Sequence, residues 1–119
     1  MTCPFCEREG IYLNKKWRMI KDLYPVSKHH HLVIPIKHTE SFQDLKVDQL
    51  EELGEALDLA VFILQNDYGI EEFNIGLNNG VSAGQTVDHV HFHIIPREAG
   101  DVDNPRGGVR GVIPSKKDY

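Results

Sequence analysis

The longest periodic stretch of the chain predicts one long helix between Asp48 and Tyr68. Apolar residues recur there at every third or fourth position, and acidic residues fill the positions between them. Asp48 suits the N-cap, and Gly69 suits the left-handed position that often ends a helix. The residues at core spacing are Leu50, Leu53, Leu57, Ala60, Val61, Leu64 and Tyr68.

The second half of this helix is apolar around more of its circumference than one core face requires. Leu59, Phe62 and Ile63 lie beside the core positions and would form an adhesive patch if they were left in water. We therefore expect a contact between two subunits to cover these three residues.

Four shorter apolar runs predict strands, and turn residues separate them. Strands before and after a single long helix, joined by tight loops, favour an α+β domain with a mainly antiparallel sheet. Residues 98–119 are rich in Gly, Pro, Asp and Arg, so we expect a loop or tail outside the core. The predicted strands cover residues 17–23, 31–36, 73–77 and 90–95.

Composition adds a size limit and a charge pattern. The 119 residues suffice for a single domain, 1–119, and no apolar run approaches the roughly 20 residues that span a bilayer. No leader pattern precedes the first strand, so a cytoplasmic protein is expected. The net charge of -5 arises in residues 47–72, which contain eight acidic and no basic residues. The rest of the surface can attract a phosphate-bearing small molecule, whereas a nucleic-acid partner is not expected.

The seven histidines fall into two groups, and the second group carries the strongest chemical signal. In the segment HVHFHII, the two-residue period of a strand places His89, His91 and His93 on one face, roughly 6.5–7 Å apart along the backbone. A single histidine there would fit the polar face of a half-exposed strand. Three alternating histidines exceed what strand propensity supplies and indicate a functional site.

The loop before this segment, residues 78–86, has the composition of a phosphate cradle. Glycines such as Gly84 let a ligand approach the backbone, and the side chains of Asn78, Gln85 and Thr86 can bind phosphate and ribose oxygens. The same composition is ordinary for a turn between strands, so the loop alone does not decide between the two interpretations.

Cys3 and Cys6 have the spacing of a zinc knuckle within residues 1–10, of a redox pair or of an incidental pair. A redox pair of the thioredoxin kind needs a preceding strand, and only two residues precede Cys3. A structural zinc needs two further ligands from elsewhere in the chain.

The segment GQTVDHVHFHIIPR resembles the signature of the histidine-triad (HIT) family, in both its nucleotide-binding and fragile-histidine-triad branches. The resemblance runs from Cys3 to about Tyr119, and the triad with the preceding Gly84-Gln85-Thr86 is its most specific part. It implies a HIT-like fold, a homodimer, and a purine nucleotide over the sheet. It also implies a two-step transfer through a covalent nucleotidyl-histidine and no organic cofactor.

The resemblance assigns roles to individual residues. His91 matches the nucleophile, the backbone carbonyl of His89 fixes its tautomer, and His93 contacts phosphate oxygens. Asn78, Gln85 and Thr86 match ribose and phosphate contacts. His30 matches a pocket histidine that often follows a Pro-Gly turn, which here reads Lys28-His29.

The resemblance also completes a metal site. In zinc-containing relatives the third ligand is a histidine after a strand like Val-Ile-Pro, and the fourth is the first triad histidine. These positions are His38 and His89, so the implied structural zinc has the ligands Cys3, Cys6, His38 and His89. Such a metal would hold the edge of the sheet and take no part in the chemistry.

The tail resembles that of a bacterial subgroup of diadenosine polyphosphate hydrolases. Arg106 and Arg110 suit the distal phosphates of such a substrate, although a solvated end explains them equally well. The leading expectation is hydrolysis of dinucleoside polyphosphates such as diadenosine tetraphosphate. A nucleoside phosphoramidase and a non-catalytic nucleotide-binding or interaction module are the alternatives.

Overall fold

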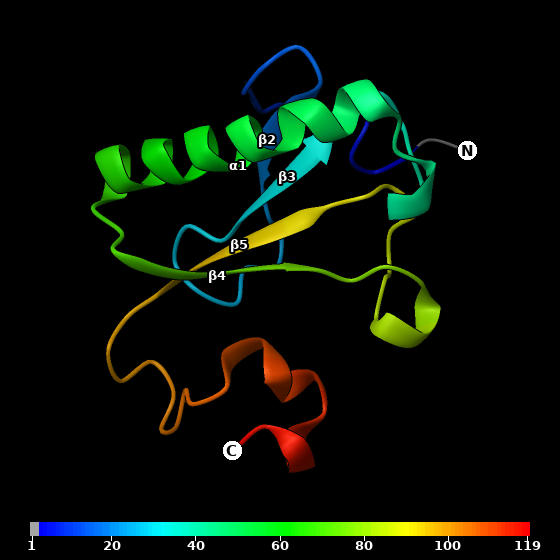
Figure 1. Ribbon diagram of the computed structural model, residues 1–119. Helices are drawn as coiled ribbons and strands as arrows, with labels where there is room; N and C mark the ends of the chain where they lie inside the picture. The colour runs from blue at the N-terminus through cyan, green and yellow to red at the C-terminus, as the bar shows by residue number, and fades with distance from the viewer. Residues whose placement is uncertain (1–2) are drawn as a thin grey trace.

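A five-stranded antiparallel sheet forms the centre of the molecule, in the strand order β1-β2-β3-β5-β4 (Figure 1). The computed structural model describes residues 3–119. With one long helix beside this sheet, the α+β class predicted from the sequence is confirmed. The strands are β1 (Ile11–Tyr12), β2 (Trp17–Lys21), β3 (His31–Pro35), β4 (Glu72–Leu77) and β5 (Phe92–Arg97).

The bounds of β5 differ from the prediction in a way that matters for the histidines. The strand begins at Phe92, two residues later than predicted, because the N–H of Val90 donates to the carbonyl of Thr39 at 2.8 Å and not to a neighbouring strand. His93 therefore lies within β5, between Leu32 of β3 and Gly76 of β4. His89 and His91 lie in the segment that leads into the strand.

The long helix α1 covers Val47–Tyr68, and its beginning corrects the predicted N-cap. Lys46 occupies the cap position, and its N–H donates to Oε1 of Gln49 at 2.7 Å. The Asp48 carboxylate lies inside the first turn and pairs instead with Lys16 at 2.9 Å. At the other end Gly69 has φ 68, as predicted for the residue that ends the helix.

Helix α1 packs across one face of the sheet, and the main core lies between them (Figure 1). Ala56, Ala60 and Leu64 are fully buried there, and the small alanines let the helix approach the sheet closely. Leu50 and Tyr68 were predicted to face this core, but they are 41% and 43% exposed. Successive residues are about 100° apart around a helix. Leu50 therefore lies well to the side of Gln49, its neighbour in sequence, which is buried.

The apolar surplus on the helix is narrower than the sequence predicts. Leu59 and Ile63 are half-buried and pack against the core, whereas Phe62 is 62% exposed. Of the three residues expected at a subunit contact, Phe62 offers the main free apolar surface.

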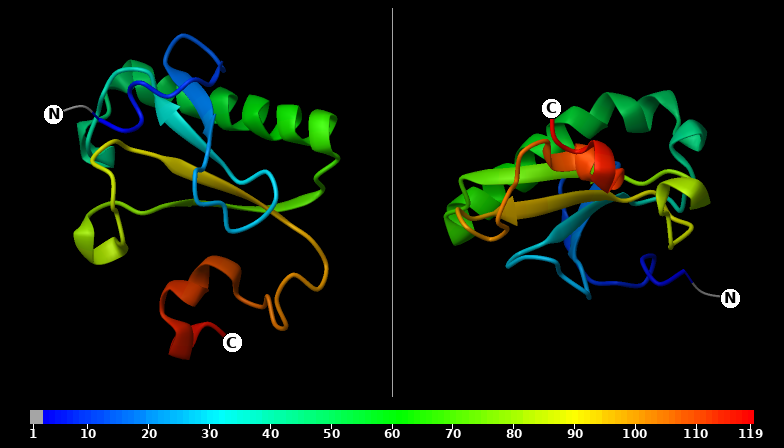
Figure 2. Two further views of the ribbon diagram at one scale, coloured as in Figure 1. Left: turned by 180° about the vertical axis from the view of Figure 1, so that it is seen from behind. Right: turned by 90° about the horizontal axis from the view of Figure 1, so that it is seen from below.

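The N-terminal segment covers the opposite face of the sheet from α1 (Figure 2). Phe5 packs there with Ile20, Leu32 and Ile34, which alternate along β2 and β3 with the residues that face the helix. Within residues 3–119, no helix has the length and apolarity that crossing a bilayer requires.

The tail after β5 lies outside the core and is ordered by two 3-10 turns, η3 (Gly108–Val112) and η4 (Pro114–Lys116). Arg106 and Arg110 donate to carbonyls of the tail itself and lie over the ring of Tyr119. Their guanidinium groups therefore hold the tail together in this structure.

Candidate active site and metal centre

One ring nitrogen of His91 donates a hydrogen bond, and the other keeps its lone pair. His91 is 5% exposed, and its Nδ1 lies 2.8 Å from the carbonyl oxygen of His89. A carbonyl only accepts hydrogen bonds, so Nδ1 carries the proton and Nε2 keeps its lone pair. The ring of Phe5 packs edge-on against His91 at 5.0 Å between centroids and keeps it from rotating. This is the arrangement that a nucleophilic imidazole needs.

The ring of His93 lies 5.1 Å from that of His91, and a chain of hydrogen bonds fixes its tautomer. The N–H of Val26 donates to Nδ1 of His30 at 3.1 Å, so His30 carries its own proton on Nε2. That Nε2 lies 2.9 Å from Nδ1 of His93, which must accept. A neutral His93 therefore carries its proton on Nε2 and can donate it.

Burial keeps these two rings neutral near pH 7. It lowers the pKa of His93 to about 4, and the neighbouring His91 and His30 rings add to the effect. Burial also lowers the pKa of His30, although the charge of Asp22 opposes it. The donor at Nε2 of His93 thus belongs to a neutral imidazole at physiological pH.

Asp22 is a site residue that the sequence reasoning missed. Its Oδ2 lies 3.4 Å from Nε2 of His30 and 4.0 Å from Nδ1 of His93, and its other oxygen accepts from the N–H of Tyr24. The carboxylate offers a second acceptor to the His30 N–H. The only available signal was an acidic residue within the predicted strand 17–23, eight positions before His30.

Asp22, His30 and His93 could in principle hold a metal, since their ligand atoms lie within 4.8 Å of one another. A metal on Nε2 of His30 would move the ring proton to Nδ1, where the N–H of Val26 already donates. Two donors would then face each other, so the cluster is better described as a hydrogen-bond chain.

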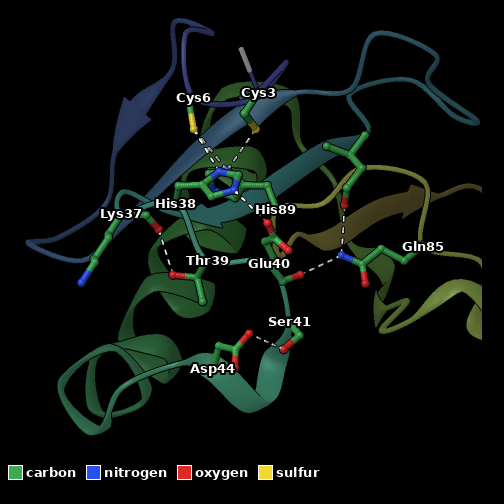
Figure 3. A network of polar contacts seen from close by, with 11 residues as sticks. Cys3, Cys6, Lys37, His38, Thr39, Glu40, Ser41, Asp44, Gln85 and His89 are labelled. Atoms are coloured by element: carbon green, nitrogen blue, oxygen red, sulfur yellow. Dashed lines mark hydrogen bonds and ion pairs between the residues drawn. The ribbon is translucent and has the colours of Figure 1, made fainter. Parts of the chain in front are cut away.

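The loop before the triad uses its glutamine to hold itself in place. The Gln85 amide donates to the carbonyl of Glu40 at 2.9 Å (Figure 3) and to that of Val87 at 3.0 Å. Its oxygen accepts from the N–H of Gly80 at 2.8 Å. Gln85 therefore fastens the loop to the segment before α1. Gly84 and Thr86 are exposed and Asn78 is half-buried, so these three remain open to a ligand.

A second cluster brings together the four predicted zinc ligands, Cys3, Cys6, His38 and His89, whose side chains converge in Figure 3. Nδ1 of His89 lies 3.4 Å from Sγ of Cys3, 3.5 Å from Sγ of Cys6 and 3.2 Å from Nδ1 of His38. Tetrahedral zinc with bonds of about 2.0–2.3 Å separates such ligand atoms by about 3.3–3.8 Å. The donor set and its spacing therefore fit a structural zinc ion.

The surroundings of the cluster support this fit. Nε2 of His89 donates to the carbonyl of Pro35 at 3.0 Å, which leaves Nδ1 free of a proton and directed at the other ligands. The buried Arg18 donates to the carbonyls of Phe5, Cys6 and Arg8 and so fastens the cysteine turn to β2. The sequence analysis did not identify Arg18, because its partners are backbone atoms.

The sequence model that describes the HIT domain family matches residues 6–100 of this chain. The chain belongs to the HIT family. An uncharacterised HIT-like protein of Methanocaldococcus jannaschii is 38% identical, over 83% of this chain and 81% of that one. The asymmetrical bis(5'-nucleosyl)-tetraphosphatase of Schizosaccharomyces pombe is 36% identical over 76% of this chain, which spans about half (50%) of that enzyme.

Solved structures of HIT proteins share the fold. Diadenosine triphosphate hydrolase of Plasmodium falciparum superposes with a TM-score of 0.73 at 30% identity, over 82% of this chain and 67% of that one. A Zn-bound histidine triad family protein of Mycobacterium smegmatis superposes with a TM-score of 0.68 at 30% identity, over 77% of this chain and 67% of that one. The predicted family and HIT-like fold are thereby confirmed.

Proposed function

We propose that this HIT protein is a nucleotide hydrolase that acts at the α-phosphorus through a covalent nucleotidyl-histidine on His91. The observation that carries the proposal is the bond from Nδ1 of His91 to the His89 carbonyl, which leaves Nε2 as a buried, oriented nucleophile. A non-catalytic binding module would have no need of this fixed tautomer.

In the first step Nε2 of His91 attacks the α-phosphorus, and the bond from phosphorus to the bridging oxygen breaks. The Nε2–H of His93 donates to phosphate oxygen as charge develops there, since the two rings are 5.1 Å apart. The leaving group departs as the remaining phosphorylated nucleotide. In the second step water attacks the same phosphorus, the bond to His91 breaks, and a nucleoside monophosphate is released.

Dinucleoside polyphosphates are the proposed substrates. Two similar proteins carry names of enzymes that act on such compounds, the tetraphosphatase of S. pombe and the diadenosine triphosphate hydrolase of P. falciparum. The exposed loop residues Gly84 and Thr86, together with Asn78, are proposed to bind phosphate and ribose. The part of Arg106 and Arg110 in binding distal phosphates stays a prediction.

A structural zinc on Cys3, Cys6, His38 and His89 is proposed from the tetrahedral spacing of these ligands. When bound, the ion supplies a cross-link between the N-terminal turn and the triad segment. His89 would serve both sites, because its ring faces the metal while its carbonyl orients His91.

A homodimer is proposed as the working assembly. The exposed Phe62 and the free edge of β4, which pairs on one side with β5, supply an apolar and a hydrogen-bonding surface for a second copy. The cytoplasmic location expected from the sequence stays a prediction.

The proposed function is tested by incubating the purified protein with diadenosine tetraphosphate and measuring released monophosphate. Quenching with an alkaline denaturant during turnover, which spares the acid-labile phosphorus–nitrogen bond, should trap a nucleotidyl adduct on His91, which mass spectrometry can locate. His91→Ala should form no adduct and lose turnover, while nucleotide affinity stays within about tenfold. Activity retained in that variant would refute the mechanism, and faster release from a nucleoside phosphoramidate would reassign the substrate class.

A further inference from the structure

His29 has a backbone conformation that its side chain disfavours. Its φ of 64 is the only positive value at a non-glycine residue within residues 3–119. Residues with a Cβ persist in this region only where their surroundings over-determine them. Some contact must therefore hold His29 in place.

Two contacts do so. The His29 ring stacks on Tyr68, with 3.6 Å between ring centroids and 8° between the planes. Its carbonyl accepts from Nδ1 of His31 at 2.6 Å. Because Tyr68 is the last residue of α1, the stack fastens the turn of residues 26–30 to the C-terminal end of the helix.

This turn sets the first link of the hydrogen-bond chain to His93. The N–H of His30 donates to the carbonyl of Ser27 at 3.3 Å, and the ring of His30 folds back to accept from the N–H of Val26. If the turn opens, Nδ1 of His30 loses the donor that selects its tautomer. The proton between His30 and His93 can then lie on either ring.

We propose that the His29–Tyr68 stack is a clamp that positions the 26–30 turn and thereby fixes the Nε2–H tautomer of His93. The effect of this clamp on catalysis rests on the proposed function, in which the N–H of His93 donates to phosphate. Its effect on the tautomer does not. Both residues act through His30 and need not touch the substrate.

The tautomers are measured directly by nitrogen-15 NMR of the histidine side chains in the ligand-free protein. The unmodified chain should show a protonated Nε2 and an unprotonated Nδ1 for His93. Tyr68→Leu keeps an apolar side chain but removes the stack, so the two nitrogen shifts of His93 should move toward an average. Tyr12→Leu is the matched control, because Tyr12 is an exposed tyrosine on β1, and it should leave His93 unchanged.

His29→Gly is the second variant. Glycine adopts a φ of 64 without strain, so this change removes the ring while permitting the same backbone path. It should reproduce the averaged His93 shifts and lower kcat about tenfold, with KM changed less than twofold. A His93 tautomer that stays fixed in both variants, in protein with native circular dichroism, would overturn the clamp.

The NMR result separates the two proposals. If the tautomer is lost in the variants but no form of the protein hydrolyses a nucleotide, the proposed function fails and the clamp stands. If hydrolysis proceeds through His91 and the tautomer of His93 is the same in both variants as in the unmodified chain, only the clamp proposal is refuted.

Discussion

Removal of the proposed zinc ion offers the sharpest test of how the N-terminal turn is joined to the candidate active site. The ligand atoms of Cys3, Cys6, His38 and His89 are already spaced for the ion, so binding should require little rearrangement. Free zinc at about a thousand times its dissociation constant adds about 4 kcal/mol to the free energy of unfolding. For a domain of this size, each kcal/mol shifts Tm by about 4 °C, so chelation should lower Tm by about 15 °C.

Catalysis should suffer less than stability. Without the metal, the His89 ring keeps its hydrogen bond to the carbonyl of Pro35, and Arg18 still holds the carbonyls of the cysteine turn. The His89 carbonyl therefore stays within reach of His91. We expect kcat to fall by less than about tenfold, which is about 1.4 kcal/mol in the activation free energy.

The assay combines metal analysis, thermal unfolding and turnover on protein purified without chelators. The unmodified chain should contain about one zinc per chain, and Cys6→Ser should lose both the metal and the Tm increment. A chelator should then have no further effect on Cys6→Ser. This variant therefore controls for effects of the chelator that do not involve the metal. Unmodified protein that contains no zinc and unfolds at the same temperature with and without chelator would refute the reasoning.

Three further predictions concern assembly, pH and the loop. Phe62→Asp should yield monomers or aggregates, and light scattering that finds the unmodified protein monomeric at micromolar concentration would contradict the dimer. The free energy of unfolding, measured in denaturant on zinc-free protein, should decrease as pH falls from 6.5 toward about 4. Over that range the unfolded chain protonates His93 while the folded chain keeps it neutral, so His93→Gln should flatten the decrease; an unchanged slope would count against it. Gln85→Ala removes three hydrogen bonds that hold the loop and should raise KM more than it lowers kcat, whereas unaltered kinetics would show the loop to be held by other contacts.

The sequence by itself determined those features that depend on short-range order. Helix α1 and its end at Gly69 follow from a 3.6-residue period and a glycine, and four of the strands follow from short apolar runs. The triad was visible because its histidines alternate within five residues. The proposed zinc ligands are scattered over 87 positions of the chain, from Cys3 to His89, and only the family resemblance joined them before the structure did.

Tertiary structure decided what each of these residues does. β5 begins at Phe92 because the N–H of Val90 is bonded to the distant carbonyl of Thr39. The ring of His89 lies among the proposed metal ligands, while the rings of His91 and His93 lie side by side in the candidate active site. Asp22 enters the site because β2 ends beside the 26–30 turn, and Arg18 matters because distant carbonyls converge on it. These contacts join residues far apart along the chain. A local pattern carries no information on which distant donor meets which acceptor. In this protein such distant pairings set the tautomers of His93 and His89, whereas neighbours in the sequence set those of His91 and His30.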